Sequence, residues 1–290
     1  MKIKSFRIEN LRNIRLAEAD GLPNFIVIAG ANGCGKSSIL EALATLKEFV
    51  SAYAGRKGRD VSHMVRTGSD FAEISAEVEI SDGELAHLVG GNNPTQKHVQ
   101  ATVRVFKNGG HQVTGTKGPV KAFSQFNPAA GAGFFDYIGP ERRVMESKLG
   151  SWSANAGTSS SQQFLMSPSE KYTEVKTYLA DLQMRDLQAL QESLKTGTPK
   201  LQDYLGGVKK HFQKFFAPMQ FKGVNISKNP FEFVVGTPDG ELDLDDMSSG
   251  EKEIVNNIVR FCQLKPQNSI VFFDEPGRSM VYDCRRHGIK

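Results

Sequence analysis

Alternating apolar and polar residues predict β-strands early in the chain. Phe6 and Ile8 fall on one face of an opening strand, and residues 71–80, FAEISAEVEI, alternate as a half-exposed antiparallel strand does. Residues 101–115, ATVRVFKNGGHQVTG, predict another strand and a turn. The continuous apolar run from Phe25 to Ala29 instead predicts a strand buried on both faces.

Helical spacing of apolar residues predicts three or four helices. One follows a Gly-rich stretch and extends to Val50, a long amphipathic one covers 169–194, a basic one covers 201–216, and one follows Met247. Residues 231–244, FEFVVGTPDGELDL, predict a hairpin with PDG at its turn. The run Ile270–Phe273 predicts a central strand of a parallel sheet, buried on both faces. Residues 128–161, rich in Gly, Ala and Ser, predict loops around one short strand.

Composition narrows the class of protein. The 290 residues carry 36 Lys and Arg against 32 Asp and Glu, a net charge of +4 that allows nucleic-acid contact without requiring it. Three cysteines, Cys34, Cys262 and Cys284, lack the spacing of a zinc site and indicate a reducing compartment. The opening segment has no apolar signal region and no run is long enough to span a bilayer, so we expect a cytoplasmic protein without a membrane partner.

A phosphate-binding loop is predicted at residues 30–38, GANGCGKSS, which match G-x-x-x-x-G-K-[ST] between a predicted strand and a predicted helix. Glycines allow backbone N–H groups to face an anion, and the helix N-terminus adds its positive dipole end. Lys36 is expected to neutralise the β and γ phosphates of ATP, and the Ser37 hydroxyl to ligate Mg²⁺. The expected nucleotide-binding residues of this loop are Gly30, Ala31, Asn32, Gly33, Cys34, Gly35, Lys36, Ser37 and Ser38.

Two further motifs follow in order. In MSSGEKEI, Ser248, Ser249, Gly250 and Glu251 stand at the start of a predicted helix, where N–H donors can face an anion and where Ser248 can also simply cap the helix. Downstream, Asp274 and Glu275 end the predicted strand SIVFF. Asp274 is the expected Mg²⁺ ligand, and Glu275 the expected catalytic residue that polarises the attacking water, alongside Lys36.

Taken together, IKSFRIENLRNI, the phosphate loop, YIGPER, MSSGEKE and DEP resemble the SMC/RecF-like branch of ABC ATPases. Within it, the chain resembles the ATPases related to the OLD proteins and anti-phage systems. The resemblance implies an α/β P-loop ATPase head with a mixed sheet, an antiparallel β subdomain and a helical insertion. It implies a homodimer that sandwiches ATP, with the signature residues 248–251 contacting the γ phosphate held by the partner, and a nuclease or toxin effector supplied in trans. DNA is a candidate partner.

The resemblance also suggests a division of the chain. We expect an N-terminal ATPase lobe at 1–125, a Gly/Ser-rich loop region at 126–168, a helical subdomain at 169–222, a segment with the signature and acidic strand at 223–277, and an unpatterned tail at 278–290. Gln125 is a candidate glutamine-loop residue. His287 stands too close to Glu275 to be the family's switch histidine. The 15 residues after Glu275 are too few for the helix and strand that follow in this family, so one edge of the central sheet is expected to lie uncovered and hydrolysis to be impaired.

Two readings of the function therefore stay open. One is an ATPase subunit that drives a DNA-directed or anti-phage effector; the other is a nucleotide-binding interaction module, or a truncated fragment, with little or no hydrolysis. A small-molecule kinase is disfavoured because MSSGE has no role there. Two basic clusters, Arg56 to Arg66 and Lys209 to Lys214, are candidate DNA contacts or simply solvated surfaces.

Overall fold

The computed structural model describes residues 1–50, 60–86, 97–117, 135–140, 144–150, 167–196, 203–264 and 269–275. The chain divides into two compact units. Unit 1 is residues 1–139, 160–165 and 266–275, and unit 2 is residues 140–159, 166–265 and 276–290. Gln125, His287, Arg56 and Arg59 lie outside the described residues.

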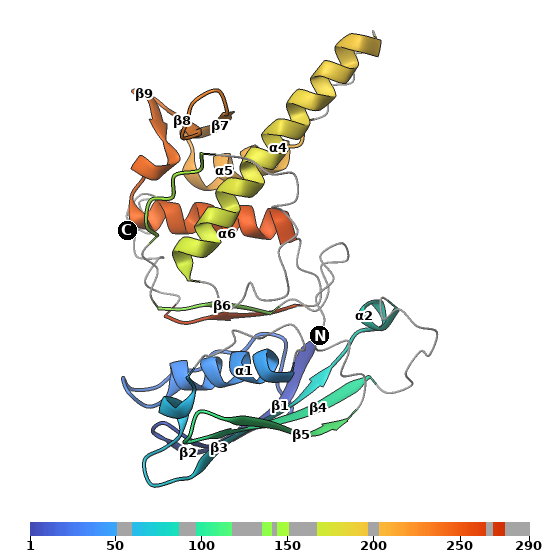
Figure 1. Cartoon of the computed structure of the whole chain (residues 1–290), viewed down its shortest axis with the longest axis vertical. Helices are drawn as coiled ribbons and strands as arrows, with labels where there is room; N and C mark the ends of the chain where they lie inside the picture. Colours follow the sequence, from blue (N-terminus) through green and yellow to red (C-terminus); the bar gives the residue numbers. More distant parts are fainter. Residues whose placement is uncertain are drawn as a thin grey trace, which may run out of the picture. The chain divides into compact units, whose positions relative to one another are not determined.

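Unit 1 contains an antiparallel sheet, a helix and a short parallel sheet (Figure 1). Among the described residues, five strands pair in the order β2-β1-β3-β4-β5. They are β1 (Lys2–Leu11), β2 (Ile14–Ala19), β3 (Phe71–Glu79), β4 (His98–Phe106) and β5 (His111–Lys117). Short helical segments, η1 (Ser62–Met64) and α2 (Asp82–Ala86), lie between them in sequence. The alternation in 71–80 thus predicted β3 correctly, with Ala72, Ile74, Ala76 and Val78 buried.

Helix α1 (Lys36–Val50) packs on one face of this sheet (Figure 1). It buries Ala42, Leu43 and Leu46 against the inward residues of β1, β3 and β4, such as Ile8, Ile74 and Val103. The same helix contacts β6 (Phe135–Ile138), which pairs in parallel with β10 (Ile270–Phe273). The helix that follows the phosphate loop therefore lies in the core of its unit.

Two expectations for buried strands are wrong. Phe25–Ala29 forms no strand, and Phe25 and Val27 are 82% and 73% exposed. A strand needs a ladder partner, and within the described residues β6 and β10 pair with each other while none pairs with this segment. Likewise β10 is parallel as predicted but not buried on both faces, since Phe272 is buried while Phe273 is 45% exposed.

Unit 2 combines helices with an antiparallel sheet. The helices are α4 (Pro168–Thr196), α5 (Gly206–Phe216) and α6 (Ser249–Leu264), and the sheet is β7 (Gln220–Asn225), β8 (Glu232–Thr237) and β9 (Gly240–Asp243), followed by η3 (Leu244–Asp246). The predicted long helix, the second helix and the hairpin are confirmed, while β7 was not predicted. Its core includes Tyr172, Val175, Phe212, Phe233 and Val255. The C-terminal part of α4 extends beyond the rest of the unit (Figure 1).

Candidate functional site

The predicted phosphate loop joins an extended segment to α1 in unit 1. Gly33 and Gly35 have φ values of +78° and +106°, which residues with a side chain rarely adopt. A Cβ at Gly30 would lie 2.9 Å from the Cys34 Sγ, so the loop is also closed tightly on itself. Helix α1 begins directly after Gly35, which has no side chain to cap it, and its first turn contains no acidic residue. The arrangement leaves a helix N-terminus accessible to an anion.

Lys36 folds back over the loop. Its Nζ donates hydrogen bonds to the carbonyl oxygens of Gly30 and Ala31, at 2.9 and 2.8 Å. The ammonium group therefore lies on the loop itself, beside the backbone that would surround a phosphate. An ammonium group in this position can neutralise phosphate charge, which is the role predicted for Lys36.

The turn between β1 and β2 lies against the phosphate loop. The Asn13 side-chain amide donates to the carbonyl oxygen of Gly33. Ile14 fills the space beside Gly35, where a Cβ would come within 2.9 Å of the Ile14 Cγ1. Arg12 forms an ion pair of 2.8 Å with Glu41 of α1. The stretch IKSFRIENLRNI contributes to the family resemblance, but no sequence motif marks Asn13 as a site residue.

The predicted acidic pair follows β10. Asp274 is 4% exposed; its backbone N–H donates to the Ile138 carbonyl at 2.9 Å, and its Oδ2 accepts a 3.1 Å hydrogen bond from the Tyr137 hydroxyl. Burial, followed by the charge of Asp274, raises the pKa of Tyr137 above its ordinary value, so the phenol stays a donor. Glu275 is exposed and has a φ of +52°, an unusual value for a residue other than glycine.

Oxygen donors suited to Mg²⁺ are present in unit 1, in the Ser37 hydroxyl and the Asp274 carboxylate. Mg²⁺ is commonly held by one or two protein ligands together with phosphate oxygens and waters. The described residues contain no group of three or more His, Cys, Asp or Glu that could hold a metal by itself. A hydroxyl and a carboxylate are donor types that suit Mg²⁺ held together with phosphate oxygens.

The predicted signature belongs to unit 2. The Ser248 Oγ accepts the Glu251 backbone N–H at 3.3 Å, and the Glu251 Oε2 accepts the Ser248 N–H and hydroxyl at 3.0 and 2.7 Å. This reciprocal pair is a capping box at the start of α6. Ser249 is exposed, and a Cβ at Gly250 would meet nothing within 4 Å.

A buried ionic cluster supports the segment before the signature. Asp245 accepts a 2.8 Å bond from the Lys176 Nζ and a 2.9 Å bond from the Tyr172 hydroxyl, both on α4. Lys176 is 1% exposed, and its Nζ also donates to the Ser147 carbonyl at 2.5 Å and lies 4.5 Å from the ring centroid of Phe233. The Lys252 Nζ donates to the Asp245 carbonyl. The approach to α6 is thus fixed by charge as well as by packing.

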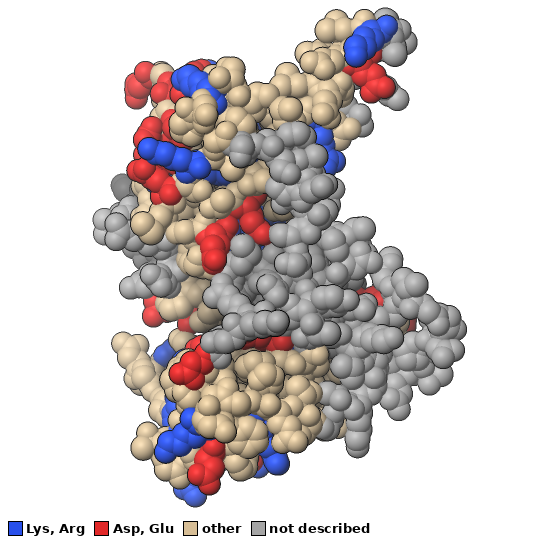
Figure 2. Space-filling model, viewed as in Figure 1, with Lys and Arg blue, Asp and Glu red and all other residues tan. Residues whose placement is uncertain are grey.

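Basic residues on α5 lie at the surface of unit 2. Val208, Phe212 and Phe216 are buried, whereas Lys210, His211 and Lys214 are exposed and Phe215 is 55% exposed. On the face shown in Figure 2, Lys and Arg are interspersed with Asp and Glu among the described residues.

The described helices include none long and apolar enough to cross a membrane.

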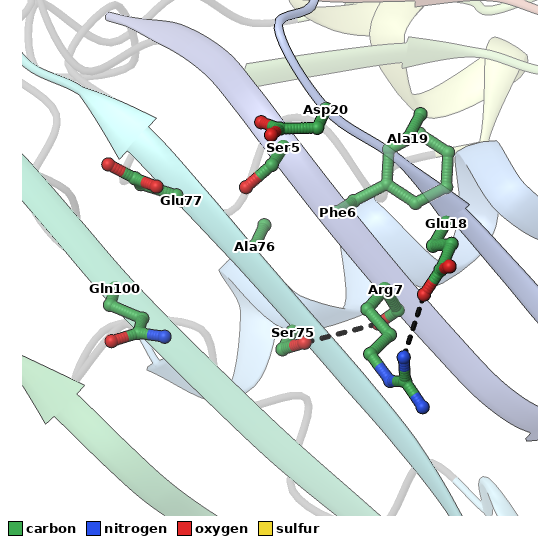
Figure 3. A pocket seen from close by; sticks show the side chains of 10 residues that line it. All are labelled: Ser5, Phe6, Arg7, Glu18, Ala19, Asp20, Ser75, Ala76, Glu77 and Gln100. Carbon is green, nitrogen blue, oxygen red and sulfur yellow. Dashed lines mark hydrogen bonds and ion pairs between the residues drawn. The ribbon is translucent and has the colours of Figure 1, made fainter.

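A groove of about 470 Å³ lies on the sheet of unit 1 (Figure 3). Its exposed side chains stand on the face opposite the one covered by α1, and its polar groups are largely paired. Arg7 bonds Glu18 at 2.7 Å, and the Arg7 carbonyl accepts from the Ser75 hydroxyl at 3.3 Å. The groove is therefore separate from the phosphate loop and gives no sign of a phosphate ligand.

Comparisons with known proteins find similarity to an ATPase domain family and to DNA-repair proteins. Residues 1–93 match the AAA ATPase domain family. The chain is 31% identical over 113 residues to the DNA replication and repair protein RecF of Pectobacterium atrosepticum, and 31% identical over 85 residues to that of Staphylococcus epidermidis. These segments cover 39% and 29% of this chain, and only 29% and 22% of the relatives.

Solved structures share the fold. The Smc head bound to the C-winged helix domain of ScpA matches with a TM-score of 0.52 at 16% identity, over 91% of this chain and 77% of that one. An Smc head with an extended coiled coil, bound to the C-terminal domain of ScpA derived from Pyrococcus furiosus, matches with a TM-score of 0.51 at 14% identity, over 91% and 79% of the two chains. The predicted fold class is confirmed. The chain thus carries an AAA ATPase domain match at residues 1–93 and shares its fold with the Smc head domains.

Proposed function

We propose that this protein binds ATP with Mg²⁺ and hydrolyses it. The observation that carries the proposal is the phosphate loop, in which two glycines with positive φ precede the N-terminus of α1 and Lys36 lies over the loop. Gly30 to Ser38 surround the phosphates, and Lys36 neutralises the β and γ phosphates. The Ser37 hydroxyl and the Asp274 carboxylate would hold Mg²⁺, which would neutralise phosphate charge when bound.

Glu275 is the residue we assign to the attacking water. A carboxylate within hydrogen-bond reach of water accepts its proton as the oxygen bonds to the γ phosphorus, and the bond to the β–γ bridging oxygen breaks to leave ADP and phosphate. The exposure of Glu275 supports the assignment, since a residue that meets water must reach it. The positive φ at Glu275 is consistent with a functional constraint on this position.

Hydrolysis in this proposal takes place in a homodimer. Ser248, Ser249, Gly250 and Glu251 at the N-terminus of α6 contact the γ phosphate bound by a second copy, so that two ATP molecules lie between two chains. The resulting nucleotide-dependent pairing drives a DNA-directed or anti-phage effector, a nuclease or toxin supplied in trans. The support is the position of these residues at a helix start, where N–H groups favour an anion.

A nucleotide-binding module with little or no hydrolysis is the second candidate. The specific observation in its favour is the capping box, which already engages the Ser248 hydroxyl with Glu251. A signature serine held in this way must exchange its partner before it can bind a phosphate. In this case ATP binds to unit 1 without the second copy being recruited.

ATP turnover by the purified protein tests the two candidates. Lys36→Ala and Glu275→Gln variants are measured alongside, and the oligomeric state is recorded with and without ATP and Mg²⁺. We expect Lys36→Ala to lose nucleotide binding, and Glu275→Gln to retain binding and form an ATP-dependent dimer with turnover reduced on the order of 100-fold or more.

The results of this experiment distinguish an ATPase from a nucleotide-binding module. Binding lost only in Lys36→Ala, with no turnover in any form, favours the module over the enzyme. Binding that is equal in the native protein and Lys36→Ala, or absent from both, overturns the proposal as a whole.

DNA is the partner we assign to the exposed basic side of α5. Three backbone contacts by Lys209, Lys210 and Lys214 would release about three counterions, so DNA affinity should fall with a log–log salt slope of about −3. A triple substitution to Ala should remove most of this slope. Affinity that does not change between low and physiological salt contradicts the assignment.

A further inference from the structure

The turn between β1 and β2 has a residue type that is unusual for its backbone conformation. Leu11 pairs with Ile14, so Arg12 and Asn13 form a two-residue hairpin turn. Arg12 has a φ of +50° and Asn10 a φ of +52°. Turns with a positive φ at the first central position ordinarily place glycine, asparagine or aspartate there. An arginine in this conformation is held by surrounding contacts, and such constraint is a reason to look for a function.

Contacts from a neighbouring segment hold the turn. The Arg12 N–H donates to the Met64 carbonyl at 2.8 Å, and the Arg66 N–H donates to the Asn10 carbonyl at 2.9 Å. The Arg66 guanidinium donates to the Asn13 carbonyl at 2.7 Å. The turn is therefore anchored from one side by backbone and side chain together.

Its other side meets the phosphate loop at two glycines and α1 at Glu41. When the loop's N–H groups face an anion, some of its carbonyls face away and need donors of their own. The Asn13 amide supplies such a donor to Gly33, Ile14 packs against Gly35, and the Arg12–Glu41 pair ties the turn to the helix. The turn and the first residue of β2 thus contact the phosphate loop at Gly33 and Gly35 and α1 at Glu41.

We infer that Asn13 is a positioning residue for nucleotide binding, which holds Gly33 in the conformation that receives phosphate. The inference rests on the proposed function and deepens it, because it assigns the preorganisation of the loop to a residue outside the loop. Asn13 acts through the Gly33 carbonyl and not by touching the reacting atoms. Its removal should therefore weaken nucleotide binding and leave the chemical step unchanged.

The experiment compares three variants in the full chain. Asn13→Ala removes the donor, Asn13→Asp keeps the shape but replaces the donor with an acceptor, and Asn108→Ala is the matched control. Asn108 lies in the β4–β5 turn of the same sheet, where its Oδ1 accepts the Gly110 N–H at 2.9 Å. The readouts are the Kd for a fluorescent ATP analogue, KM and kcat for ATP, and the Tm without nucleotide.

We expect Asn13→Ala to raise Kd and KM by about 3- to 10-fold, the value of one hydrogen bond, with kcat unchanged. Asn13→Asp should bind the nucleotide more weakly still, because its carboxylate faces the Gly33 carbonyl oxygen and repels it. Asn108→Ala should leave Kd unchanged while lowering Tm at least as much as Asn13→Ala does.

Equal Kd values for the native protein and both Asn13 variants, with binding lost in Lys36→Ala, would overturn this inference and leave the proposed function intact. Loss of binding in Asn108→Ala as large as in Asn13→Ala would reduce Asn13 to a structural role. If the native protein binds no nucleotide, the proposed function fails first.

Discussion

The two helix starts that carry the predicted site, α1 in unit 1 and α6 in unit 2, are built differently. Helix α1 follows a glycine, has no acidic residue in its first turn and leaves its N-terminus to an outside anion. Helix α6 follows Ser248, and Glu251 closes a capping box on it. The first has the features that favour an anion at a helix start. The second is already satisfied by its own carboxylate, so binding an anion there requires an exchange of partners.

The two units also differ in how the charge of a buried lysine is compensated. In α4, Lys176 is held by the Asp245 carboxylate and the Ser147 carbonyl. In α1, Lys47 is 3% exposed, and burial lowers its pKa to about 7 despite the opposing charge of Glu84. The charge of Lys176 is thus compensated by ion pairing, whereas burial shifts Lys47 towards its neutral form.

We expect the largest effect on nucleotide affinity from Gly35→Ala, which adds a methyl group to the phosphate loop. Gly35→Ala places a Cβ 2.9 Å from Ile14 and forces alanine to a φ of +106°. We expect stability to fall by about 1–3 kcal/mol from the strained backbone. Nucleotide affinity should fall on the order of 100-fold, because the loop must shift to relieve the clash. Calorimetric titration with ATP and thermal unfolding measure the two.

Gly250→Ala is the matched change at α6. It lies within a helix with open space around its Cβ, so it should stabilise the protein by about 0.5–1 kcal/mol and leave ATP binding by unit 1 unchanged. Equal losses of affinity in the two variants would mean that the two helix starts do not differ as described.

Sequence reasoning predicted most of the elements because it reads local pattern. The alternation in β3 and the helical spacing in α4 are set by residues close in sequence, and both elements formed as predicted. The loop motif placed Gly33 and Gly35, whose positive φ values follow from the residue type.

What it could not predict is which segments pair. Phe25–Ala29 has the composition of a buried strand, yet strand formation depends on a ladder partner that no local pattern specifies. The Tyr137 bond to Asp274 joins residues 137 positions apart, and Asn13 reaches Gly33 across 20 positions. Such contacts follow from topology, so local pattern indicated the motif residues but not the residues that contact them.

Lys47 should give the next largest effect, a dependence of the folding stability on pH. Because its folded pKa is about 7 and its ordinary value is 10.5, the unfolded chain binds the extra proton between these values. Stability should therefore rise with pH across this window, by at most about 1.4 kcal/mol per pH unit from this group. Lys47→Met should be more stable than the native protein at pH 7 and lose this slope, as measured by denaturant unfolding from pH 7 to 10.

Lys176→Met is the control from unit 2. It leaves the Asp245 carboxylate without its lysine, so stability should fall by about 3 kcal/mol at neutral pH. If both lysine substitutions destabilise the protein equally at pH 7, the contrast between the two buried lysines is wrong.

The smallest effect, and the sharpest test of the second helix start, comes from Ser248. Ser248→Ala removes the cap of α6 and should cost about 1 kcal/mol, whereas Ser249→Ala, at an exposed neighbouring position, should cost little. If the capping box only stabilises the helix, the ATP-dependent dimer of Glu275→Gln should survive Ser248→Ala. If Ser248 exchanges Glu251 for the phosphate of a second copy, the dimer should be lost although ATP still binds. Sedimentation with and without ATP distinguishes these outcomes, because a cap and a phosphate ligand predict the same loss of stability but opposite states of assembly.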